Sequence, residues 1–142
     1  MRDIFSETRD HFGPNDKETV EAASSLSFVM IENGECTECT QFLKDFGLLD
    51  LAMHFYGADG NDMLFLRTLQ ARALFKDENA SSDDLRQAVG ILEEVFRTSS
   101  RVLGAGHPDT LEIPWCLGEA REKLALAEQP VAARTRHSRA EP

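Results

Sequence analysis

The sequence predicts an all-α fold in the form of a short α-solenoid, and three observations carry that prediction. Apolar residues recur at intervals of three and four along each long segment, which is the period of a helix face. No stretch alternates apolar and polar residues with β-branched side chains, so we expect no sheet. Gly13, Gly57 and Gly104 open similar polar loops at spacings of 44 and 47 residues, and a period in the forties with two helices per repeat is typical of solenoids.

The first three expected helices are bounded by turn and cap chemistry. Residues 2–12 end at Gly13, where a left-handed C-cap is favoured, and residues 17–32 start after a Gly-Pro-Asn-Asp loop. The apolar face of the helix over 17–32 consists of Val20, Ala23, Leu26, Ser27 and Met30. A third helix over 35–56 follows an Asn-Gly pair, and its apolar stripe consists of Cys36, Cys39, Leu43, Phe46, Leu49 and Met53.

The second half of the chain continues the pattern. A fourth helix over 61–76 follows the loop at Gly57, and a fifth over 83–103 follows a Ser-Ser-Asp-Asp segment that favours capping. A sixth helix over 108–127 begins at Pro108, which suits a first helical position. Residues 128–142 lack a core pattern, so we expect a disordered tail there, and it is basic because it contains Arg134, Arg136, His137 and Arg139.

The loop before the last helix carries a family resemblance. The run from Leu103 to Leu111 reads LGAGHPDTL, with His107 and Pro108 at its centre. It resembles the inter-repeat loop of kinesin-light-chain-type tetratricopeptide repeats, which have a unit of about 42 residues. The first unit is similar in register, because Thr19, Leu26 and Gly34 match the pattern and Cys36 and Cys39 fall on its core positions. In the second unit Leu85 and Ala88 match, with extra residues in the loop before them.

The resemblance implies a short right-handed solenoid of antiparallel helix pairs with about six helices. It would occupy residues 1–127, with two complete helical pairs and a half-unit on each side. Gly13, Gly57, Gly104, His107 and Pro108 would be structural residues of the inter-repeat loops. In this family the first helices of the pairs line a concave groove that holds peptides or helices of partner proteins. The resemblance therefore implies a protein-interaction module.

The candidate groove residues follow from the family positions that often hold paired asparagines. Here these positions hold Ser24 and Ser25, Thr68 and Leu69, and Trp115 and Cys116. With no asparagine pair we expect a small, apolar and partly aromatic groove, which suits an amphipathic helix better than an extended peptide. Acidic rims are expected from Glu21, Glu32 and Glu112. Trp115 is the candidate for the strongest contact, although it could instead pack the end of the solenoid, where Pro114 would kink the helix.

The composition limits the classes of partner. Twenty-five acidic and fifteen basic residues leave a net charge of −10, which argues against nucleic acid and anionic membranes and favours a basic or amphipathic protein segment. No run is long and apolar enough for a membrane span, and the N-terminus does not resemble a signal peptide. Three cysteines are too few for a disulfide scaffold, so we expect a soluble protein of the cytoplasm or another reducing compartment.

The residues suited to catalysis do not form a recognisable pattern. Cys36-Thr37-Glu38-Cys39 could be a redox pair or half of a zinc site, but no second ligand pair follows and the repeat register already explains both cysteines as core positions. The four histidines lie far apart, and the Asp-rich loops lack EF-hand spacing. We therefore expect no enzyme activity, no metal, no cofactor and no small-molecule ligand.

Three functional hypotheses remain, in decreasing order of preference. The first is an interaction module that presents a concave groove to a peptide or helix of a partner. The second is a structural subunit whose ends are covered by neighbours in a larger assembly. The third is a metal or redox protein that uses Cys36 and Cys39.

Overall fold

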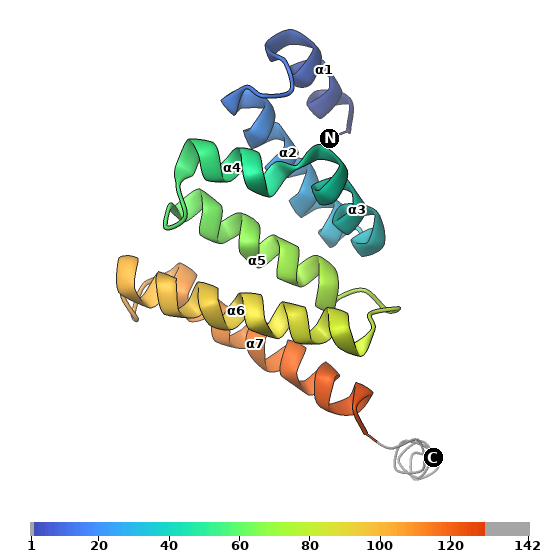
Figure 1. Cartoon of the computed structure of the whole chain (residues 1–142), viewed down its shortest axis with the longest axis vertical. Coiled ribbons are helices and arrows are strands. Elements are labelled where there is room, and N and C mark those ends of the chain that lie inside the picture. Colours follow the sequence, from blue (N-terminus) through green and yellow to red (C-terminus); the bar gives the residue numbers. More distant parts are fainter. Residues whose placement is uncertain (1, 130–142) are drawn as a thin grey trace.

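A computed structural model describes residues 2–129, which contain seven helices and no strand, so the all-α prediction is confirmed for this range. Figure 1 shows the helices stacked along the long axis of the molecule. They are α1 (Arg2–Phe12), α2 (Lys17–Glu32), α3 (Cys36–Phe46), α4 (Leu48–Tyr56), α5 (Asn61–Phe75), α6 (Ser82–Val102) and α7 (Pro108–Ala127). None of these helices is long and apolar enough to cross a membrane.

Most helix ends agree with the prediction because their signals are local. Asp16 accepts a hydrogen bond from the backbone N–H of Glu18 at the start of α2. Ser81 and Asp84 form a reciprocal capping box at the start of α6. His107 caps α7, because its Nδ1 accepts the backbone N–H of Asp109 at 3.1 Å. Each of these contacts satisfies an N–H that has no partner within its helix.

The single helix predicted over 35–56 is wrong, because Gly47 divides it into α3 and α4. Gly47 has φ 68° and ψ 35°, a left-handed backbone conformation that residues with a Cβ atom rarely adopt. The break changes the phase of the apolar stripe. Leu48 and Ala52 are buried where Leu49 and Met53 were expected, and Met53 is 44% exposed. The chain therefore has seven helices in the described range rather than about six.

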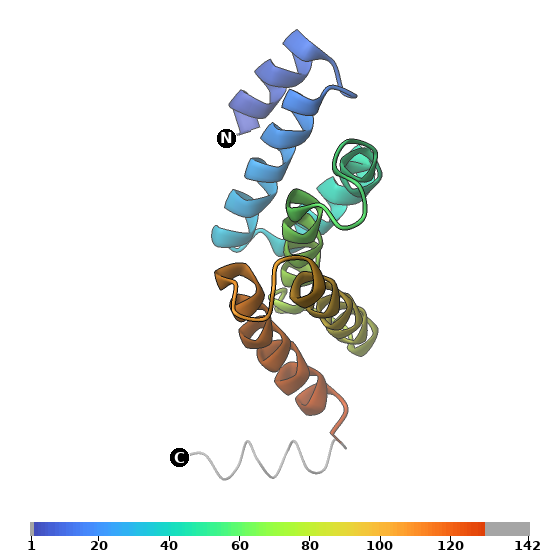
Figure 2. The same ribbon diagram turned by 90° about the vertical axis from the view of Figure 1, so that its left-hand side faces the viewer.

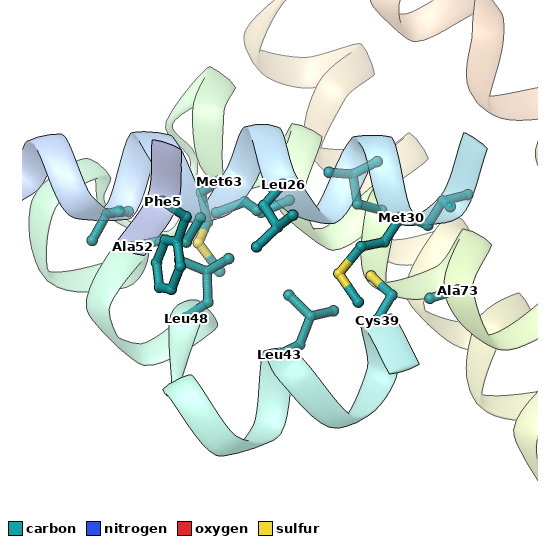
Figure 3. Close-up of a cluster of buried hydrophobic side chains, with 14 residues drawn as sticks. Phe5, Leu26, Met30, Cys39, Leu43, Leu48, Ala52, Met63 and Ala73 are labelled. Carbon is teal, nitrogen blue, oxygen red and sulfur yellow. The ribbon is translucent and has the colours of Figure 1, made fainter. Parts of the chain in front are cut away.

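Two clusters of buried side chains form the core, and α5 contributes to both. The first cluster contains side chains from each of the helices α1, α2, α3, α4 and α5. In Figure 3, Leu43 of α3 and Leu48 of α4 point towards α2, and Met30 lies beside Cys39. The second joins α5, α6 and α7. Leu66 and Leu69 of α5 belong to the first cluster, whereas Leu64 and Phe75 of α5 belong to the second. A helix that is buried on opposite faces has no single apolar stripe.

The helices α2, α5 and α7 lie one after another along one side of the molecule. The central helix α5 contacts α2, α3, α4, α6 and α7. Figure 2 shows α2 and α7 on one side of the molecule and α6 on the other, with α5 between them. Residues 130–142, which include the four predicted basic residues of the tail, lie outside the described residues. Glu128, expected to begin the tail, instead caps α7 and forms an ion pair with Arg86 at 2.6 Å.

Candidate functional site

Two cavities open along the side of the molecule formed by α2, α5 and α7. One, of about 550 Å³, lies between α5 and α7, and the other, of about 600 Å³, lies between α2 and α5. Asp62 and Phe65 of α5 line both. The two cavities therefore adjoin at these two residues, and we call the surface that holds both the α2–α5–α7 groove.

All eight residues predicted for a partner groove lie along these cavities. Thr68, Leu69, Glu112, Trp115 and Cys116 line the first, and Glu21, Ser24 and Ser25 line the second. They come from three helices that are far apart in the sequence. Leu69 differs from the others because its side chain has no exposed surface, so it supports the groove from beneath and cannot itself contact a partner.

Three aromatic side chains are exposed along the groove. Phe28 of α2 and Phe65 of α5 have ring centroids 6.4 Å apart, and they are 39% and 47% exposed. Trp115 of α7 is 83% exposed, so it does not pack the end of the stack. Exposed aromatic side chains grouped in a concave surface are typical of contact sites for other molecules.

Phe28 and Phe65 were not identified from the sequence, although one of them carried a signal. Phe28 falls outside the stripe of Leu26 and Met30, so an aromatic residue on the exposed face of α2 could have been noticed. Phe65 carried no such signal, because α5 is apolar around most of its circumference and its exposed face cannot be identified from periodicity.

Two hydroxyl groups of the groove are already engaged by their own helices. Ser24 donates to the backbone oxygen of Val20 at 2.9 Å, and Thr68 donates to that of Leu64 at 2.9 Å. Such bonds to the preceding turn are common for Ser and Thr inside helices. The apolar surface and the charged groups are therefore the main features available to a ligand.

Carboxylates gather where the three helices begin. Glu21, Asp62, Asp109 and Glu112 all line the cavities near these ends. Tyr56 lies beside them, and its pKa is raised, first by burial and then by the negative charges of Glu21, Asp62 and Glu18. The smaller part of the shift, which comes from these three acids, reflects negative charge around Tyr56, and the ammonium group of Lys17 lies 5.7 Å from its ring.

The opposite end of the groove holds bases that are paired with acids. Arg72 binds Glu32 at 3.0 Å, which links α5 to α2, and Lys76 lies 3.8 Å from Glu119, which links α5 to α7. Glu32, predicted as part of an acidic rim, is therefore compensated by Arg72. The uncompensated negative charge is confined to the end of the groove where the helices begin.

The cysteines are placed for packing. Cys36 and Cys39 are buried in the first turn of α3, and Cys39 is part of the first core cluster. Burial raises the pKa of Cys39 to about 11 and also raises the pKa of Cys36 and of Cys116. A thiol with a raised pKa is a poor nucleophile and a poor metal ligand at neutral pH. Within residues 2–129, no three His, Cys, Asp or Glu side chains are grouped so that they could hold a metal ion.

The histidines occupy separate places in the described part of the chain. His107 caps α7, while His11 and His54 lie in the last turns of α1 and α4. The ring of His11 lies edge-on to that of Phe12, and the ring of His54 lies edge-on to that of Phe55. None of the three lies among the residues that line the groove.

Comparison with known proteins adds no family to this description. No family model matches the chain, and no curated protein or solved structure matches it either. The chemistry and geometry of the α2–α5–α7 groove are therefore the basis for a functional proposal.

Proposed function

We propose that this chain is a protein-interaction module with a tetratricopeptide-like solenoid fold. Its α2–α5–α7 groove would hold an amphipathic, basic segment of a partner protein. The observation that carries the proposal is the row of exposed aromatic side chains beside uncompensated carboxylates in one concave surface. This combination offers apolar contact and cation attraction without catalytic groups.

Equivalent loop geometry supports the repeat interpretation. Gly13, Gly57 and Gly104 follow α1, α4 and α6, and their φ angles of 92°, 76° and 98° are all positive. Thr19 and Thr110 occupy equivalent places after the first and third glycines, and both are fully buried. A glycine with positive φ after the helix, followed six residues later by a buried threonine, is expected of repeated helical units.

The dimensions of the groove favour a helical ligand. Packed helices lie about 8–10 Å apart, so three neighbouring helices span about 20 Å. A helix rises about 1.5 Å per residue, so about 13 residues of a partner helix would cross the groove. Apolar residues on one face would contact Phe28, Phe65 and Trp115, and basic residues beside them would face Glu21 and Glu112.

Selection from a random peptide library on the purified chain tests this proposal. We expect the selected peptides to combine Lys or Arg with apolar residues at helical spacing. Trp115→Ala should abolish their binding, whereas Leu126→Ala should leave it unchanged, because Leu126 is also an exposed apolar residue of α7 but does not line the groove. Peptides that bind both variants as tightly as the native chain would contradict the proposal.

The carboxylates can be tested separately with the same peptides. Replacing Glu21, Asp62 and Glu112 by their amides should weaken binding most at low salt, because their contribution is electrostatic. The substitution Glu93→Gln serves as a control, since Glu93 lies on α6 outside the groove. If the triple variant binds the peptides with native affinity, the basic character of the proposed partner is wrong.

A structural role in a larger assembly is a second candidate, and the ends of the stack favour it. Leu111 aligns with the buried Val20 and Leu64 but is 56% exposed, since no helix follows α7 within residues 2–129. At the other end, Ile4 and Phe12 of α1 are 56% and 48% exposed. Sedimentation equilibrium distinguishes the roles: a subunit of this kind should self-associate through these ends, and a separate module should remain monomeric.

A further inference from the structure

Four carboxylates near the start of α2, α5 and α7 form no ion pair within residues 2–129. They are Glu18, Glu21, Asp62 and Glu112. Three of them line the groove, and Glu18 lies close enough to Tyr56 to contribute to its raised pKa. Like charges held together on a surface are relieved when a cationic group binds beside them.

The chain contains its own cationic segment. Beyond Gln129 it reads PVAARTRHSRAEP, with Arg134, Arg136 and Arg139 against the single acid Glu141. This basic segment belongs to a chain whose net charge is −10. It also offers the small apolar residues Val131, Ala132 and Ala133. Its composition therefore matches the ligand that the groove chemistry favours.

The segment also has the required reach. It leaves α7, which forms one wall of the groove, at Ala127. Glu112 lies 15 residues back along α7, a distance of about 22 Å at 1.5 Å per residue. Glu128 is held against α6 by Arg86, so the reach is counted from Gln129. Arg136 lies seven residues beyond Gln129, which allows a span of about 24 Å in an extended chain, and Arg139 lies ten residues beyond it, which allows about 34 Å, enough to approach the acids of the neighbouring helices.

We propose that residues 130–142 dock back into the α2–α5–α7 groove of the same chain, with their arginines beside Glu112, Asp62 and Glu21. The docked segment would cover Trp115 and compete with a partner protein for the same surface. This inference uses the groove of the proposed function. It makes the groove self-inhibited, so that a partner has to displace the segment.

Trp115 provides a direct measurement, because it is the only tryptophan in the chain and it lies in the groove. The experiment compares acrylamide quenching of its fluorescence in the full chain and in a chain that ends at Gln129. We expect quenching to be weaker in the full chain at low salt and to rise to the level of the shortened chain in 1 M salt, where the Debye length is about 3 Å. Equal quenching of the two chains at low salt would overturn the proposal.

Matched variants of the full chain assign the effect to charge. Replacing Arg134, Arg136 and Arg139 by Ser should reproduce the quenching of the shortened chain. Replacing Thr135 and Ser138 by Ala changes the same segment without changing its charge, and this variant should retain the protection of Trp115. If the arginine variant stays protected, or if the control loses protection, the charge-based docking is wrong.

The concentration dependence separates docking within a chain from docking between copies. Within one chain a short connection gives an effective concentration in the millimolar range, so protection of Trp115 should be the same at all micromolar protein concentrations. Protection that grows with protein concentration, together with a dimer in sedimentation, would overturn docking within a single chain.

A last comparison separates this inference from the proposed function. The probe is one basic amphipathic peptide from the library selection, titrated into both chains. We expect the shortened chain to bind it about tenfold more tightly, the change that results when the segment occupies about nine-tenths of the grooves. Equal, Trp115-dependent binding to both chains would overturn the inference but support the proposed function, and a peptide that binds neither chain would contradict both.

Discussion

At the scale of single residues, two members of the predicted groove set have different roles. Leu69 is fully buried in the first core cluster, whereas Trp115 is 83% exposed. Leu69→Ala should lower the free energy of unfolding by about 2–5 kcal/mol, since it leaves a cavity in a packed core. Trp115→Ala should change it by no more than about 0.5 kcal/mol. Urea denaturation followed by circular dichroism measures both, and similar losses would show that Trp115 is a packing residue.

The buried thiol of Cys39 predicts a dependence of stability on pH. Burial raises its pKa from 9.0 in the unfolded chain to about 11 in the folded one. The unfolded chain therefore loses this proton first, and stability present below pH 9 is lost as the pH rises to 11, by about 2–3 kcal/mol. The difference in unfolding free energy between the native chain and Cys39→Ala should therefore shrink over this range. A constant difference would show that the thiol titrates normally.

At the scale of elements, the break between α3 and α4 depends on one glycine. Gly47→Ala should destabilise the fold by about 1 kcal/mol, because alanine in the left-handed conformation is strained. Gly90 is the matched control: it lies inside α6, is exposed, and has no other atom close to the place of an added Cβ. Gly90→Ala should stabilise by about 0.5–1 kcal/mol through its helix propensity. Thermal unfolding of both variants shows whether each substitution raises or lowers the stability. A stabilising effect of Gly47→Ala would argue against a helix break at this position.

A contact between distant helices also caps α5. The ammonium group of Lys123 in α7 donates to the backbone oxygen of Phe75 at 2.9 Å and lies 5.7 Å from the centre of its ring. It satisfies one of the carbonyl groups that have no partner at the end of a helix. Lys123→Met, which keeps the apolar stem, should cost about 1 kcal/mol in thermal or urea unfolding. An unchanged midpoint would show that water replaces this bond without loss.

At the scale of the whole molecule, α5 couples the two core clusters. Leu66 belongs to the first cluster and Leu92 to the second, and both are fully buried. Because α5 packs into both clusters, we expect Leu66→Ala and Leu92→Ala each to lower hydrogen-exchange protection in α2 and α7 alike. Protection lost in only one half of the molecule would show that the halves unfold independently.

The helices and most of their ends were predictable because their signals are local. The capping box at Ser81, the cap at His107 and the glycines after α1, α4 and α6 act on neighbouring residues. Gly47 was missed because a glycine within an apolar stripe is compatible with a continuous helix, and its conformation became evident only with the packing of Leu48. The candidate groove positions were chosen from the repeat register of the resemblance, and in the structure they line the two cavities. The repeat register could not predict that Leu69 is buried.

The sequence by itself determined the all-α class, the helix limits near caps and glycines, and the net charge of −10. The helix limits depend on residues within a few positions of one another, and the net charge depends on composition alone. Only the tertiary structure decided which side chains are exposed on α5, which acids find basic partners, and that Phe28 and Phe65 lie side by side. The pair of Arg72 and Glu32 joins residues 40 positions apart. Such contacts follow from how helices pack in space, which the period of a single helix does not specify.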